Sequence, residues 1–273
     1  MTNLREGEFA ETGSLRYSLA RKFCLALMLC VPATFGQLGP CATAIGPDLP
    51  DLIVNRPTLR ASKSLTVELI ETNDCQLVEG CVNASGQRRL LRFTTNTPNI
   101  GRAALVIGDP SQCDLLFHFS ECHGHYHLEQ YADYRLWKRA GFKFWRRHRD
   151  WSAPVSSAEN TGLLQTLEAR GDLIAGRKQG FCMVDSSLYP SQQENPPARV
   201  FDNCSGNQGI SVGWSDDYLS VLACQFIDLT DAAPGRYFLE VEVNPDRVLP
   251  ESDYGNNSSH IGVRIPAIAR SGR

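Results

Sequence analysis

The chain has 273 residues, of which 27 are Lys or Arg and 30 are Asp or Glu, so its formal net charge is −3. The content of 42% hydrophobic and 21% charged residues is typical of a globular protein and excludes a disordered, collagenous or coiled-coil chain. A sequence pI of about 6.1 provides no basic footprint for nucleic acid, so we expect no nucleic-acid partner.

The first 44 residues are typical of an export signal. The basic pair Arg21-Lys22 precedes an apolar run at 23–35 that is too short to span a bilayer, and Ala-Thr-Ala at 42–44 has the small residues after which a signal peptidase cuts. We therefore predict a signal peptide and export segment at 1–44 and one mature domain at 45–273. The mature domain has no run long and apolar enough for a stable membrane span, so we expect a secreted protein, extracellular or periplasmic.

The chain contains ten cysteines. Export would remove Cys24, Cys30 and Cys41, and seven cysteines would remain in the mature domain: Cys75, Cys81, Cys113, Cys122, Cys182, Cys204 and Cys224. An oxidising compartment favours disulfides among them. Because seven is odd, we expect at least one thiol to stay unpaired or to pair outside the chain.

Short alternating runs predict strands along most of the mature domain. In chain order these runs are 64–70, 90–95, 103–107, 131–137, 236–244 and 261–265. The clearest is 236–244 (RYFLEVEVN), in which apolar side chains share one face while Glu240 and Glu242 lie on the other.

Between these runs the pattern is less regular. Leu163, Leu164 and Leu167 recur at helical spacing, which predicts one short helix. We interpret two segments as irregular loops: the proline-rich 189–199, and 142–151, where we expect exposed arginines stacked on tryptophan. The whole pattern predicts a mainly β fold, a single Greek-key-like β-sandwich domain with long loops and one short helix.

Half of the six histidines lie within five positions, as His123, His125 and His127. This crowding predicts a metal site built on neutral imidazoles, with copper or zinc as the metal. On a straight strand the outer two residues are about 13 Å apart, so a single ion about 2.0–2.1 Å from each nitrogen requires a bent backbone, which Gly124 permits. Three histidines without a fourth protein ligand leave an open position, as in catalytic metal sites.

The segment that contains these histidines resembles the copper-binding signature of lysyl oxidases. It is Cys-His-Gly-His-Tyr-His at 122–127, followed by Tyr131 and Tyr134. Two blocks near the C-terminus, 208–237 and 243–257, are similar to the same family in the order and spacing of their motifs. The resemblance implies that residues 45–273 form a lysyl oxidase-like catalytic domain.

The resemblance also implies a copper amine oxidase that uses Cu(II) and lysine tyrosylquinone, a cofactor made by cross-linking a lysine to an oxidised tyrosine. In the family the tyrosine stands six residues before a cysteine, here Tyr218 before Cys224, and the lysine stands four before another, here Lys178 before Cys182. The implied reaction oxidises a primary amine, of peptidyl lysine or of a small molecule, with dioxygen. Its products are an aldehyde, hydrogen peroxide and ammonia.

The same family implies a disulfide framework. There, the first cysteine of a pair spaced like Cys75 and Cys81 bridges to the copper motif, and the second bridges to the cysteine after the quinone tyrosine. Carried over, these pairings are Cys75–Cys122 and Cys81–Cys224, and Cys182 would then pair with Cys204. Cys113 is left without a partner.

Each catalytic interpretation of the histidine cluster needs a base. For the amine oxidase, Asp216, Asp217 and Asp228 lie near Tyr218 in sequence, and nothing chooses between them. A zinc hydrolase with a metal-bound water on the same histidines is the first alternative, and its only acids beside the motif are Glu121 and Glu129. A non-catalytic copper-binding β-sandwich is the second alternative.

Overall fold

The computed structural model describes residues 41–44, 47–176, 180–190 and 197–267. Its strands are β1 (Thr43–Ala44), β2 (Ser64–Ile70), β3 (Gly86–Arg92), β4 (Thr95–Pro98), β5 (Leu105–Gly108), β6 (Phe117–Ser120), β7 (His125–Leu128), β8 (Ala132–Lys138), β9 (Leu173–Ala175), β10 (Ser187–Leu188), β11 (Gln208–Ile210), β12 (Trp214–Tyr218), β13 (Phe226–Asp228), β14 (Gly235–Val243) and β15 (Ser258–Ile265). Its helices are α1 (Arg56–Ser62), α2 (Cys75–Val78), α3 (Arg139–His148) and α4 (Ala158–Ala169), with a 3-10 turn η1 (Pro110–Gln112).

The mainly β class is confirmed, and the strands form several small antiparallel sheets. Their strand orders are β15-β14-β8-β9, β13-β3-β2, β10-β12-β4, β1-β5-β11 and β6-β7. Strands β6 and β7 form a hairpin that carries the histidines, while β12 carries Tyr218 in a different sheet. No helix in the described ranges has the length and apolar character needed to cross a membrane.

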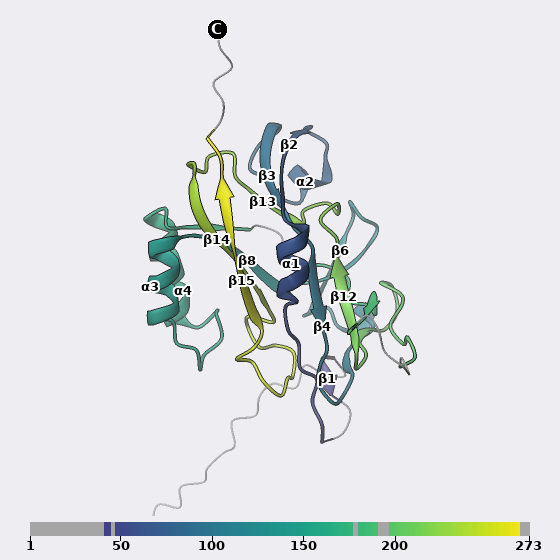
Figure 1. The fold of residues 1–273 in the computed structure, drawn as a ribbon. Coiled ribbons are helices and arrows are strands. Elements are labelled where there is room, and N and C mark those ends of the chain that lie inside the picture. The colour runs from purple at the N-terminus through teal and green to yellow at the C-terminus, as the bar shows by residue number, and fades with distance from the viewer. Residues whose placement is uncertain (1–40, 45–46, 177–179, 191–196, 268–273) are drawn as a thin grey trace, which may run out of the picture. The chain divides into compact units, whose positions relative to one another are not determined.

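The longest strand, β14, is buried on both faces. Tyr237, Leu239, Val241 and Val243 enter the main hydrophobic core, as the alternation predicts. The opposite face, with its two glutamates, is covered by α3 and α4, which lie side by side against this sheet (Figure 1). The glutamates are buried there with two arginines, and the ion pairs are Arg135–Glu240, Arg135–Glu242 and Arg149–Glu242. Each buried glutamate on this face therefore has an arginine partner, which compensates for its loss of contact with water.

The interpretation of 142–151 as a loop is wrong, because most of it belongs to α3. Phe142 and Trp145 are three residues apart on the helix and both face the core, where Trp145 stacks on Trp137 with ring centroids 5.6 Å apart. The expected stacking of arginine on tryptophan is present, since the Arg149 guanidinium lies 4.4 Å from the Trp151 ring centroid, but this arginine is buried and not exposed as expected. The predicted leucine helix is confirmed as α4, whose N-cap Ser157 accepts a hydrogen bond from a backbone N–H.

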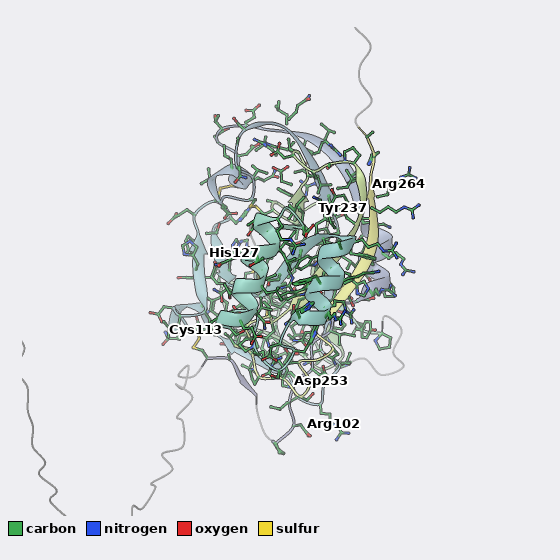
Figure 2. All side chains as sticks on the ribbon, turned by 90° about the vertical axis from the view of Figure 1, so that its left-hand side faces the viewer. Arg102, Cys113, His127, Tyr237, Asp253 and Arg264 are labelled. Carbon is green, nitrogen blue, oxygen red and sulfur yellow. A yellow bond between two sulfur atoms is a disulfide. The ribbon has the colours of Figure 1, made fainter. Side chains whose placement is uncertain are left out.

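The three disulfides implied by the family, Cys75–Cys122, Cys81–Cys224 and Cys182–Cys204, are confirmed. The expectation that Cys113 has no partner is wrong, because it bonds to Cys41 (Figure 2). Cys41 is buried in the main core, and the next strand, β1, pairs with β5. Residues on the N-terminal side of the cut expected after Ala44 therefore belong to the folded domain in this structure.

We predict that any processing of the N-terminus leaves Cys41 in place. Replacing both cysteines, as Cys41→Ala/Cys113→Ala, removes a cross-link between residues 72 apart, which should lower the free energy of unfolding by about 4 kcal/mol. Denaturant unfolding of the purified protein measures this loss. If the double variant unfolds like the wild type, and intact mass places the N-terminus after residue 44, the cut expected from the sequence is the correct one.

Candidate metal and cofactor site

The histidine motif lies on the β6–β7 hairpin. Gly124 has φ of +68°, a left-handed conformation that glycine adopts without strain, and it turns the chain between the two strands. This is the bend that the sequence requires. His123 lies in the turn, while His125 and His127 are two residues apart on β7 and share a face. The three ring centroids are 4.9–5.8 Å apart.

Two of the imidazoles have the geometry of a metal-binding pair. The Nε2 atoms of His125 and His127 are 3.1 Å apart. If both bound one ion at about 2.0–2.1 Å, the angle at the metal would be about 100°, between the square-planar and tetrahedral values. The Nδ1 atom of His125 lies 3.0 Å from the carbonyl oxygen of His123 and donates its proton there, so its Nε2 is left as a lone-pair donor for a metal. These residues fit a copper or zinc ion.

A fourth group, Glu79, joins the site and was missed from the sequence. The ligating atoms of Glu79, His123 and His127 lie within 4.8 Å of one another. Glu79 directly follows α2, more than 40 residues before the histidine motif. The one sequence signal that could have found it is its place between Cys75 and Cys81, both of which were expected to bond to the active-site segments.

Tyr218 lies on the last position of β12, where it pairs with Thr95 of β4. Its side chain is 4% exposed, and its ring packs on Phe181 with centroids 4.2 Å apart. The phenol donates a hydrogen bond to the backbone carbonyl of Cys182. Burial, together with the nearby carboxyl of Asp216, raises the pKa of Tyr218 well above its ordinary value, so the phenol is neutral at physiological pH. Tyr218 therefore packs in the main core, and it also lines a cavity.

One cavity of about 260 Å³ brings the predicted residues together. Its walls include His123, His125, His127, Asp216, Asp217 and Tyr218. The disulfide Cys182–Cys204 forms another part of the wall. Lys178, the second residue expected to form the cofactor, lies outside the described residues. The hairpin and β12 come from separate sheets, so the cavity lies where the two sheets meet.

The structure distinguishes the three aspartates that the sequence could not. Asp216 and Asp217 line the cavity, while the carboxylate of Asp228 accepts hydrogen bonds from Thr230 in another part of the domain. Asp216 is 1% exposed, and burial together with the charge of Asp217 raises its pKa to about 8. A carboxyl with this pKa exchanges a proton near neutral pH, as a general base requires.

The zinc-hydrolase alternative loses the acids that the sequence offered it. Glu121 and Glu129 are exposed, and neither is among the described residues that line the cavity. A hydrolytic base would have to lie within hydrogen-bond reach of a metal-bound water. Among the described residues, the acidic groups that line the cavity with the histidines are two aspartates and a tyrosine.

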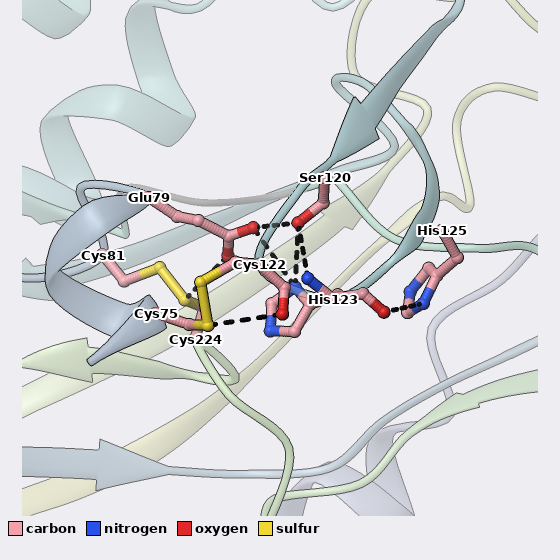
Figure 3. Close-up of a disulfide and its surroundings, with 8 residues drawn as sticks. All are labelled: Cys75, Glu79, Cys81, Ser120, Cys122, His123, His125 and Cys224. Atoms are coloured by element: carbon pink, nitrogen blue, oxygen red, sulfur yellow. Dashed lines mark hydrogen bonds and ion pairs between the residues drawn. A yellow bond between two sulfur atoms is a disulfide. The ribbon is translucent and has the colours of Figure 1, made fainter. Parts of the chain in front are cut away.

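Two disulfides fix both halves of the site to one short segment. Cys75, at the start of α2, bonds to Cys122 beside the first histidine, and Cys81 bonds to Cys224 after Tyr218. Figure 3 shows the two bonds near each other, with the side chain of Glu79 above them in this view. Cross-links of this kind reduce the conformational freedom of the segments that must meet at the cavity.

The sequence of the chain is similar to known proteins. The family model described as lysyl oxidase matches residues 50–152 and 152–266. Lysyl oxidase homolog 2 of Mus musculus is 29% identical over 230 residues, 79% of this chain and 25% of that protein. Lysyl oxidase homolog 2 of Xenopus tropicalis is 30% identical over 217 residues (76% and 24%), and lysyl oxidase homolog 3B of Danio rerio is 29% identical over 218 (76% and 22%). The chain belongs to the lysyl oxidase family, and it spans about a quarter of the length of these relatives.

Proposed function

We propose that the protein is a secreted copper amine oxidase, which oxidises a primary amine to an aldehyde and releases hydrogen peroxide and ammonia. The observation that carries the proposal is the cavity shared by three imidazoles, a buried tyrosine and a buried carboxyl of raised pKa. Membership of the lysyl oxidase family supports the same chemistry. Four disulfides support an oxidising, extracellular or periplasmic compartment.

Cu(II) would be held by His123, His125 and His127. A site of neutral nitrogen ligands binds Cu(II) more tightly than other divalent first-row metals, and the spacing of the His125 and His127 nitrogens suits its angles. The metal supplies redox chemistry with dioxygen, which no unassisted side chain provides. The chain's own contribution is to orient the rings and to enclose the cavity beside them.

Tyr218 and Lys178 are the proposed source of the lysine tyrosylquinone. The hydroxyl of Tyr218 is bonded to the carbonyl of Cys182, four residues after Lys178. Four extended residues span at most about 14 Å, so the chain is short enough to keep the lysine in the neighbourhood of the ring. Burial of Tyr218 among Phe181 and Tyr131 holds the ring in one orientation and limits water around it.

The walls of the cavity suit an alkylamine. Phe181, Val184 and Leu222 provide apolar contact for an aliphatic chain, while the carboxylate of Asp217 attracts the ammonium group. A peptidyl lysine side chain and a small primary amine both have this combination of an apolar stem and a cationic end. Both are therefore proposed as substrates, with dioxygen as the electron acceptor.

We assign Asp216 as the base that removes the substrate α-proton. It lies two residues before Tyr218, it faces the same cavity, and its pKa of about 8 makes its carboxylate a stronger base than an exposed aspartate. Ser186 donates a hydrogen bond to one carboxyl oxygen at 3.3 Å and holds the group in place. Asp217, in contrast, accepts a hydrogen bond from Asn96, which draws it toward β4.

The function is tested by loading apoprotein with Cu(II) or with Zn(II) in air and adding n-butylamine or an N-blocked lysine amide. We expect peroxide and ammonia in equal amounts from the copper form and neither from the zinc form. Hydrolysis of esters or amides by the zinc form, with no peroxide from the copper form, would establish the hydrolase instead. Copper binding without any turnover would establish the non-catalytic binding protein.

A further inference from the structure

We propose that Glu79 is a positioning residue of the metal site: its carboxylate holds the Nδ1 atom of His123 so that the Nε2 atom of this ring faces the metal. The inference rests on the proposed metal site, and it adds a residue that the three-histidine signature does not contain. Such a carboxylate–histidine–metal arrangement fixes the orientation of the ring and increases the basicity of the ligand.

The contacts of Glu79 form a small network around one ring nitrogen. Its Oε1 atom lies 3.2 Å from Nδ1 of His123. The hydroxyl of Ser120 donates to the same carboxylate oxygen and lies 3.3 Å from the same nitrogen. The backbone N–H of His123 donates to the Ser120 hydroxyl oxygen at 3.2 Å. Figure 3 shows the three side chains converging, with the ring of His123 between the carboxylate and His125.

These contacts select one tautomer of the ring. A neutral imidazole has one N–H, and a carboxylate oxygen can only accept, so the proton of His123 belongs on Nδ1. The lone pair is then on Nε2. His125 has the same tautomer for an analogous reason, because its Nδ1 faces the carbonyl oxygen of His123 at 3.0 Å. The two rings therefore offer the same kind of nitrogen to the metal.

The surroundings of Glu79 favour this role over direct ligation. Its side chain is largely buried, and the Oε1 atom nearest the imidazoles is occupied by the Ser120 hydroxyl and by Nδ1 of His123. The other carboxylate oxygen points toward Cys224, which is bonded to Cys81, so no thiolate is available there for a second metal. The bond between Cys75 and Cys122 joins α2 to the histidine hairpin and keeps the carboxylate at this distance.

The test is the Cu(II) affinity of apoprotein, measured by competition with a chelating dye. Glu79→Gln keeps the shape of the side chain but removes the charge, and we expect the affinity to fall about 10- to 100-fold. Glu121→Gln is the matched control, because Glu121 is exposed two residues before His123 and its removal changes the net charge equally. We expect this control to bind copper like the wild type. Equal affinities of Glu79→Gln and the control would overturn the proposal.

A double-mutant cycle separates positioning from ligation. In a His123→Ala background a positioning residue has nothing left to orient, so Glu79→Gln should cause no further loss of Cu(II) affinity. A further loss of about tenfold or more in that background would identify Glu79 as a ligand and overturn the proposal. The electron paramagnetic resonance spectrum of the Cu(II) form adds a second readout, in which Glu79→Gln and His123→Ala should shift the copper parameters in the same direction.

Ser120→Ala provides a second route if Glu79→Gln does not fold. It removes the hydroxyl that anchors the carboxylate, and a smaller loss of affinity is expected in the same assay. Every readout is metal binding by apoprotein. A protein that binds copper but makes no peroxide would therefore overturn the proposed function, while the copper affinities would still decide the role of Glu79. If the enzyme is fully active but Glu79→Gln and Ser120→Ala both bind copper with unchanged affinity, the proposed function stands and the role of Glu79 is overturned.

Discussion

Replacing Tyr218 by Phe is expected to abolish amine oxidation and leave Cu(II) binding unchanged. Without the hydroxyl the ring cannot be oxidised to the quinone, whereas the imidazoles that bind the metal come from another sheet. The substitution also removes the hydrogen bond to the buried carbonyl of Cys182, so the free energy of unfolding should fall by about 1–3 kcal/mol. Peroxide release, quinone absorbance and copper content of the same preparation measure the two effects separately.

Tyr131→Phe is the matched control for Tyr218→Phe. Tyr131 is also a buried tyrosine, its ring centroid is 5.6 Å from that of Tyr218, and its hydroxyl bonds to Thr97. Its loss should cost a similar amount of stability while the quinone absorbance persists. Peroxide production by Tyr218→Phe at the wild-type rate would contradict the cofactor assignment.

Asp216→Asn should slow amine oxidation about 10²- to 10⁴-fold, the usual contribution of a positioned base.

In apoprotein held in a chelator, the Asp216→Asn substitution should increase the free energy of unfolding. The folded-state pKa of about 8 lies above the value near 4 of an unfolded aspartate, so the wild type loses stability as the pH rises between these values, by about 1.4 kcal/mol per pH unit. Asparagine does not ionise, and the gain should therefore be absent at pH 3 and greatest above pH 8.

Asp228→Asn is the control for this prediction, since Asp228 lies outside the described lining of the cavity. Asp228→Asn should reduce the turnover rate much less than Asp216→Asn does. It should also change the pH dependence of unfolding much less. Turnover of a lysine amide and urea unfolding at several pH values provide the data. If both asparagine variants retain the wild-type rate, Asp216 is not the base.

Much of the fold follows from alternation of apolar side chains. The strand predicted at 64–70 has the bounds of β2, and those predicted at 131–137 and 236–244 differ from β8 and β14 by one residue at each end. The prediction failed at α3, because its buried face consists of Gly141, Phe142 and Trp145 and its other positions are mostly basic. A helix with so few buried positions has no apolar stripe long enough to be recognised from the sequence.

The site was predictable where its residues are local and not where they are distant. His123, His125 and His127 are close in sequence, and the motif around Tyr218 has a characteristic spacing. Glu79 and Cys41 reach their partners only through tertiary pairing, across 44 and 72 residues. Burial of Asp216 is equally a tertiary effect, since its neighbours in sequence are polar.

The measurement that tests the central claim most directly is peptide mass spectrometry of the copper-loaded protein after turnover in air. The account predicts that the peptides containing Lys178 and Tyr218 are recovered as one cross-linked species, which is absent from apoprotein and from Tyr218→Phe. Recovery of unmodified Lys178 and unmodified Tyr218 from fully active enzyme would contradict it.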